Sequence, residues 1–102
     1  MQLRDHPKIR HWPPTWGGPY GPGHEFVLGE DAPVKGVRLV GPDHIGPARL
    51  YLDIEYKGNK DSGFISTNNP TFMVRLYDKV NEELKARRAR SVHDIGNMEI
   101  DF

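Results

Sequence analysis

The clearest pattern along the chain is a strict alternation of apolar and polar positions between Arg49 and Tyr56. Successive side chains of a β-strand point to opposite faces, so every second residue shares a face. One face therefore carries Leu50, Leu52, Ile54 and Tyr56, and the other carries Arg49, Tyr51, Asp53 and Glu55. An antiparallel sheet with one face on a core and one face in water produces this alternation. The pattern predicts a half-buried central strand.

A second strand is predicted to return along the first as a hairpin. The composition of residues 57–63 favours a turn, and residues 64–67 are typical of extended chain. A two-residue loop at 58–59 would pair Leu52 with Ile65, and a four-residue loop would shift that pairing by two residues. Both registers place Ile65 on the buried face, because they differ by an even number of residues.

A long amphipathic helix is predicted from Pro70 to Arg88. Asn69 is a favourable N-cap, and proline fits the first helical position because its missing N–H would be unpaired there anyway. One apolar stripe follows at helical spacing, formed by Phe72, Met73, Leu76, Tyr77, Val80 and Leu84. Glu83 is spaced to pair with Arg87, and the basic residues of the last turns complement the helix dipole.

Shorter elements are predicted on both sides of this nucleus. Residues 24–28 and 35–40 are strand candidates, Ser91 and Asp94 have approximate capping-box spacing, and the alternation in 98–102 indicates a last edge strand. The fold class is therefore α+β, with a mostly antiparallel four- to five-stranded sheet and one long helix packed on one face. The predicted core consists of Leu50, Leu52, Ile54, Ile65, Phe72, Leu76, Val80 and Leu84.

The first 23 residues have a different composition, rich in proline, glycine and aromatic residues. Trp12, Trp16 and Tyr20 recur every four residues in this segment. Tryptophan and tyrosine dominate binding hot spots, so these three residues are candidate partner-binding residues. The alternative is that the segment folds back and buries its aromatic rings, which we favour for the two tryptophans. We predict an arm over 1–23, ordered against the sheet, and a single α+β domain over 24–102.

The order of these features carries a resemblance. Trp12-Pro13-Pro14 and Trp16 are followed by a strand meander, a hairpin, a helix and the terminal segment Ser91–Gly96. This order resembles short uncharacterised bacterial proteins with a WPPxW-type N-terminal segment. The resemblance implies a bacterial source and transfers no site residues.

Composition and charge exclude several classes of protein. The 102 residues allow one domain, and 14 basic residues balance 14 acidic ones, which gives no global reason to expect nucleic acid or an anionic membrane. The absence of cysteine excludes disulfides and thiolate zinc sites. No apolar run approaches the roughly 18 residues of a membrane span, and the N-terminal residues contain no apolar run typical of a signal peptide. We expect no membrane partner and, by default, a cytoplasmic protein.

Groups that carry catalysis or bind metal do not converge in the sequence. The 5 histidines are scattered, without the spacing of metal ligands. Asp53 and Glu55 share a strand face, but neither a cleft nor a nucleophile elbow is indicated. We therefore predict no catalytic residue, no metal and no cofactor.

The remaining charge cluster lies at the end of the predicted helix and contains Lys85, Arg87, Arg88 and Arg90. Four cations in six residues can hold phosphates, although they also complement the helix dipole. The first functional hypothesis is a small non-enzymatic module that binds another protein or associates with itself. The alternatives are a nucleic-acid-binding accessory module that uses the basic cluster, and a small enzyme subunit completed by oligomerisation.

Overall fold

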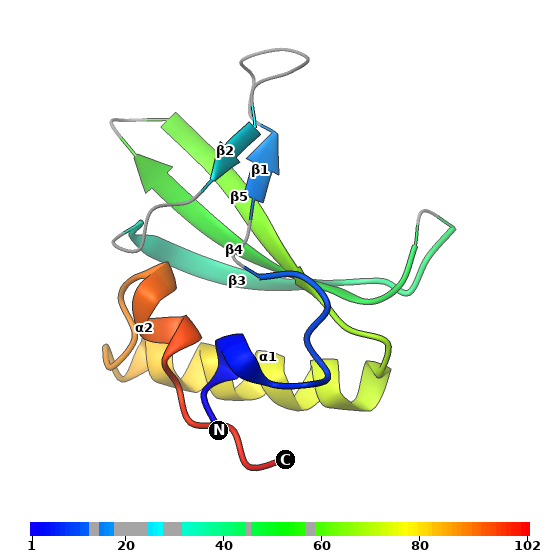
Figure 1. Cartoon of the computed structure of the whole chain (residues 1–102). Coiled ribbons are helices and arrows are strands. Elements are labelled where there is room, and N and C mark those ends of the chain that lie inside the picture. Colours follow the sequence, from blue (N-terminus) through cyan, green and yellow to red (C-terminus); the bar gives the residue numbers. More distant parts are fainter. Residues whose placement is uncertain (13–14, 18–24, 28–31, 45, 57–58) are drawn as a thin grey trace.

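A sheet lies on one long helix in the computed structural model, which describes residues 1–12, 15–17, 25–27, 32–44, 46–56 and 59–102 (Figure 1). The elements are η1 (Leu3–Asp5), β1 (Thr15–Gly17), β2 (Glu25–Val27), β3 (Val34–Val40), β4 (Arg49–Tyr56), β5 (Asn59–Ser66), α1 (Pro70–Lys85) and α2 (Val92–Gly96). Strands β3, β4 and β5 form a three-stranded antiparallel meander, with β4 in the centre. The predicted α+β class and the central strand are confirmed.

The hairpin between β4 and β5 is confirmed, but both predicted registers are wrong. Leu50 pairs with Ile65, and Leu52 pairs with Gly63, two residues away from the register of a 58–59 loop. The polar residues 59–63, assigned to a turn by composition, belong to β5 instead. Two completely buried apolar residues, Leu50 and Ile65, face each other in this register, which favours it. Ile65 remains on the buried face because the shift is even.

The number of strands in the sheet also differs from the prediction. β1 and β2 pair with each other in a separate two-stranded sheet, beside β5. Among the described residues, the predicted edge strand over 98–102 is reduced to an isolated bridge between Gln2 and Glu99. The alternation in this segment still predicts which side chains are buried, since Ile100 is buried while Glu99 and Asp101 are exposed.

The core forms where the inner face of the sheet meets α1. The buried residues of the predicted core are Leu50, Leu52, Ile54 and Ile65 from the sheet and Phe72, Leu76 and Val80 from α1. Leu84 packs against this cluster and is half-buried. Two periodicities meet here, one of two residues in the strands and one of 3.6 in the helix, which is why the sequence pattern identifies these positions.

The start of α1 is confirmed in detail. The Asn69 side chain accepts a hydrogen bond from the backbone N–H of Phe72 at 3.0 Å, and Pro70 occupies the first turn. The backbone carbonyl of Asn69 also accepts a hydrogen bond from Met73 at 3.0 Å. Together these bonds satisfy donors that the first turn of any helix leaves unpaired.

The end of α1 was predicted at the wrong residue. The helix ends at Lys85, and Arg87 follows with a φ angle of 58°, in the left-handed region. The N–H of Arg87 donates to the carbonyl of Leu84 at 3.1 Å, and that of Arg88 donates to Glu83 at 2.9 Å. This is a Schellman cap, in which glycine usually occupies the left-handed position. An arginine there costs about 1–2 kcal/mol.

The cap also changes the predicted ion pair. Glu83 lies 3.6 Å from Arg88, instead of pairing with Arg87. The reason is that the left-handed residue turns the chain away from the helix axis, so the spacing of four residues no longer places Arg87 above Glu83.

The two ends of the chain pack side by side against the helical layer (Figure 1). Residues 1–12 belong to the predicted arm, yet Leu3 is completely buried and donates its N–H to Met98 at 2.8 Å. Trp12 packs on the core, above Gly96 at the end of α2. A Cβ atom on Gly96 would lie 2.5 Å from Cζ2 of Trp12 and 2.8 Å from Nη2 of Arg4. The absence of a side chain at Gly96 therefore admits the indole.

We expect Leu76→Ala to lower the free energy of unfolding by about 2–5 kcal/mol, because it removes a completely buried side chain at the centre of the helix–sheet contact. Val74→Ala is the control, since Val74 is 48% exposed on the same helix and should change stability by about 0.5 kcal/mol or less. Urea melts of both variants provide the comparison. A loss below about 1 kcal/mol for Leu76→Ala would contradict the assigned helix face.

We expect Gly96→Ala to destabilise the protein by about 1–3 kcal/mol, because the new methyl group overlaps a rigid indole. The control is Gly36→Ala, where the nearest atom to the added Cβ is an Asp53 oxygen at 3.6 Å, an ordinary contact. Thermal melts should separate the two variants. Equal stability would show that Trp12 does not occupy this position.

Candidate functional site

A row of four planar side chains crosses the outer face of the sheet, on the side opposite α1. The register places Arg38 of β3, Tyr51 of β4 and Phe64 of β5 directly beside one another. Side chains alternate along each strand, so these three share the face opposite to Leu50, Leu52 and Ile65. His11 extends the row, since its ring stacks on Phe64 with a centroid distance of 4.8 Å and an interplanar angle of 17°. We call these four residues the outer row.

Each member of the outer row is held by its neighbours. The guanidinium of Arg38 lies 5.2 Å from the centroid of the Tyr51 ring, and the Tyr51 and Phe64 centroids are 6.0 Å apart. Nε of Arg38 donates to both carboxylate oxygens of Asp53, at 3.0 and 3.1 Å. Gly36 lies beside this carboxylate and presents no side chain to it. The contacts fix the orientation of Arg38 while 55% of its side chain stays exposed.

The two arginines described beside the outer row are both paired with carboxylates. Asp53 neutralises Arg38, and Asp43 accepts from Nη2 of Arg49 at 2.9 Å. Tyr51, Phe64 and His11 are half-buried, so part of each ring remains in contact with water. Figure 1 shows α1 and α2 on the other side of the sheet. The outer row is therefore an aromatic surface with a paired arginine, which neither helix covers and beside which β1 packs on β5.

The aromatic residues singled out in the arm are not brought together by the described contacts. Trp12 is half-buried above Gly96, on the side of α2. Trp16 lies in β1 and pairs with Phe26, and its side chain lies outside the described part of the structure. Tyr20 also lies outside the described residues. The partner-binding role predicted for these three residues stays a prediction.

The basic cluster after α1 is divided by the Schellman cap. Lys85 is exposed at the last helical position, and Arg88 lies 3.9 Å from Glu82 and 3.6 Å from Glu83. Arg87 and Arg90, in contrast, line a pocket of about 400 Å³ together with Lys35 at the start of β3. Pro33, Val34, Leu84 and Ala89 complete its walls.

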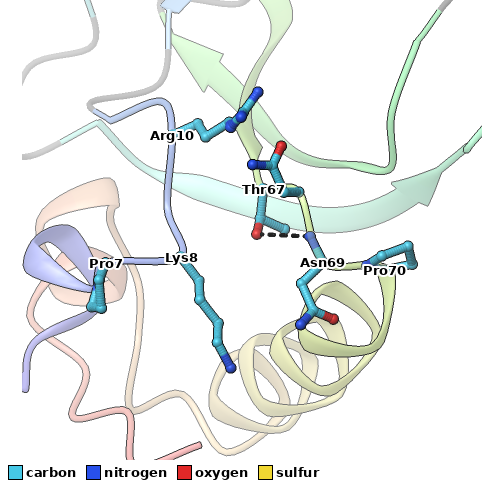
Figure 2. Close-up of a pocket in the computed structure, with 7 residues that line it drawn as sticks. Pro7, Lys8, Arg10, Thr67, Asn69 and Pro70 are labelled. Carbon is cyan, nitrogen blue, oxygen red and sulfur yellow. Dashed lines mark hydrogen bonds between the residues drawn. The ribbon is translucent and has the colours of Figure 1, made fainter.

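A second pocket, of about 590 Å³, lies at the other end of α1 (Figure 2). Lys8 and Arg10 line it with the polar segment 67–69. Figure 2 shows that the Thr67 hydroxyl faces the Asn69 backbone, from which it accepts a hydrogen bond at 3.3 Å. The ammonium of Lys8 lies 5.5 Å from the centre of the Phe72 ring. Thr67 and Asn69 of this pocket therefore take part in capping α1, and Lys8 packs on Phe72.

No protein-family model, curated protein or solved structure matches the chain. Within the described residues, no helix is long and apolar enough to cross a membrane. The same part of the chain holds no group of three or more histidine, cysteine, aspartate or glutamate side chains placed to bind a metal ion.

Sequence reasoning missed the outer row because the row depends on register. The alternation predicts Tyr51 on the polar face of the central strand. An aromatic ring on that otherwise charged face is the one feature of the sequence that points to the outer row. The predicted 58–59 loop, however, would have paired Phe64 with Asp53 instead of Tyr51. Arg38 and His11 come from segments that only the tertiary fold brings to this face.

Asp94 fixes the loop that carries Arg90. Its carboxylate accepts hydrogen bonds from the N–H groups of Arg90 at 2.9 Å and Ser91 at 3.1 Å, while the Ser91 hydroxyl accepts from the Asp94 N–H. The predicted capping box of Ser91 and Asp94 is confirmed. The hydrogen bond from the Arg90 backbone is the largest cause that lowers the pKa of Asp94, because it stabilises the charged form.

We expect Asp94→Ala to cost about 1 kcal/mol of stability at pH 7. Because the folded pKa lies below the ordinary value of 3.8, the contribution of the carboxylate is present above that value and disappears as the pH falls through the folded pKa. Urea melts of the wild-type protein and Asp94→Ala at pH 7 and at about pH 2 provide the comparison. The difference between their free energies of unfolding should become smaller in acid.

Asp78→Ala is the control for this experiment, since Asp78 is exposed on α1. It should change stability by about 0.5 kcal/mol or less at both pH values. A loss for Asp94→Ala that is equal at neutral and acidic pH would contradict the assigned role of its charge.

Proposed function

We propose that this chain is a small non-enzymatic module that binds another protein through the outer row of its sheet. The observation that supports the proposal is the row itself, in which Arg38, Tyr51, Phe64 and His11 contact one another on the face opposite α1. Tyrosine and arginine are enriched at the centres of protein interfaces, where they combine large contact area with a polar end.

Preorganisation favours binding at this face. A side chain that loses rotamer freedom on binding costs about 0.5–1.5 kcal/mol of affinity. Arg38 is already held by Asp53 and by the Tyr51 ring, so that cost is incurred during folding instead. The same holds for Phe64, which is packed between Tyr51 and His11.

The charge and ring geometry favour a protein partner over nucleic acid. Arg38 and Arg49 are both paired with carboxylates, so these two arginines, as far as the structure describes this face, offer no unpaired positive charge to a phosphate backbone. Bases stack on open aromatic faces, whereas the face of Phe64 is occupied by His11 and Tyr51 lies beneath the Arg38 guanidinium. An aromatic surface with a paired arginine suits the mixed composition of a protein interface.

We expect the double variant Tyr51→Ala/Phe64→Ala to lose its partner. The immobilised wild-type protein should capture a protein from a lysate that the double variant, at equal loading, captures at least about tenfold less, as expected for two hot-spot residues. Mass spectrometry identifies the captured protein, and sedimentation of the purified chain reveals whether the partner is a second copy. Circular dichroism checks that the variant is folded.

The matched control is Val74→Ala/Arg75→Ala, which removes an exposed apolar and an exposed cationic side chain from the outer side of α1. It should capture the partner like the wild-type protein. The proposal fails if both double variants bind equally, or if the captured material is nucleic acid released in proportion to salt.

A further inference from the structure

The pocket at the end of α1 gathers positive charge from two distant parts of the chain. Lys35 is the second residue of β3, and Arg87 and Arg90 lie in the connection between α1 and α2. Among the described residues, no ion pair engages any of these three side chains, and no carboxylate lines the pocket. All three residues are exposed.

Backbone hydrogen bonds hold the two parts together. The N–H of Val34 donates to the carbonyl of Arg90 at 2.9 Å, and the N–H of Val92 donates to the carbonyl of Ala32 at 2.9 Å. A bridge between Pro33 and Ser91 lies between these bonds. The positions from which Lys35 and Arg90 project are therefore set by the fold, not by flexible loops.

Arg87 occupies a position where the backbone disfavours it. The left-handed residue of a Schellman cap is usually glycine, and an arginine is strained there. Strained backbone positions of this kind cluster at ligand-binding sites, which makes Arg87 a candidate binding residue. The described residues that line the pocket beside Arg87 are apolar or cationic, so its guanidinium would meet an anion there.

We propose that this pocket, bounded by Lys35, Arg87 and Arg90, binds a phosphate monoester. Guanidinium groups hold phosphate oxygens through paired N–H donors, and the lysine adds a point charge. Val34, Leu84 and Pro33 form an apolar wall for the carbon group that carries the phosphate. A volume of about 400 Å³ lies in the range of small-ligand sites.

The surroundings select a single phosphate over a polyanion. Glu82 and Glu83 lie close to Arg88, and Asp94 holds the backbone of Arg90, so carboxylates lie beside the connection that carries Arg87 and Arg90. A nucleic-acid backbone passing across this region would meet them, whereas among the described lining residues the charged groups that a phosphate in the pocket would meet are the three cations. The end of the α1 dipole opposes an anion, but its partial charge of about one half is outweighed by three full charges.

The test measures binding of phenyl phosphate to the full chain by calorimetry, with benzyl alcohol as the uncharged comparison. Phenyl phosphate should bind, and more weakly at pH 5 than at pH 7, because the second ionisation of a phosphate monoester lies near pH 6. Arg87→Gly should weaken binding by about tenfold, the loss expected for one charged hydrogen bond. Its Tm should be unchanged or higher, because glycine suits the left-handed position.

Lys85→Gln is the matched control, because it removes an adjacent exposed cation that does not line the pocket. It should leave the affinity unchanged, and so should Tyr51→Ala/Phe64→Ala, which separates this proposal from the proposed protein-binding face. A phosphoserine peptide that binds more tightly than phenyl phosphate identifies a phosphorylated partner as the source, and equal binding identifies a small molecule.

Three outcomes overturn the proposal. The first is that phenyl phosphate fails to bind at millimolar concentration. The second is that Lys85→Gln weakens binding as much as Arg87→Gly does. The third is that a single-stranded oligonucleotide binds more tightly than either phosphate probe and loses affinity equally with each cation removed. The last two results would assign the cluster to general electrostatic attraction of a polyanion.

Discussion

The structure depends on one contact, the packing of the apolar face of α1 on the inner face of the β3–β4–β5 sheet. Leu50, Leu52 and Ile65 meet Leu76 and Val80 there, and all five are completely buried. In a chain of 102 residues this contact is the main source of stability, because an isolated helix of this length or a lone hairpin is marginal in water. Both helices lie on one side of the sheet, and the outer row lies on the opposite side.

The chain ends complete the helical layer and thereby position the second candidate site. Leu3 and Trp12 pack near α2, whose Gly96 admits the indole, and the strand-like pairing of 32–34 with 90–92 ties the start of β3 to the end of the helices. Positively charged side chains from β3 and from the α1–α2 connection line one pocket beside this pairing. The outer row and the cationic pocket thus belong to different surfaces, and a protein partner and a phosphate would not compete for the same residues.

The sequence is informative wherever one local pattern decides the outcome. Periodicity identifies the buried faces of β4 and α1, and the capping residues Asn69, Ser91 and Asp94 act as their types predict. It fails where the outcome depends on competition between distant segments. The polar residues 59–63 have the composition of a turn, yet they pair with β4, and the outer row exists only in that register. The end of α1 is missed for a different reason. A left-handed helix cap is usually marked by glycine, and the arginine at position 87 gives no such signal.

Hydroxyl-radical footprinting of the captured complex tests the central claim most directly, because it reports the solvent access of individual aromatic side chains. In the free protein, Tyr51 and Phe64 should be oxidised in keeping with their partial exposure, and Met1 should be oxidised strongly at 64% exposure. In the complex, oxidation of Tyr51 and Phe64 should fall while that of Met1 and Val74 stays the same. Unchanged oxidation of Tyr51 and Phe64, with protection confined to α1 or to the chain ends, would contradict the account and move the interface to the helical side of the molecule.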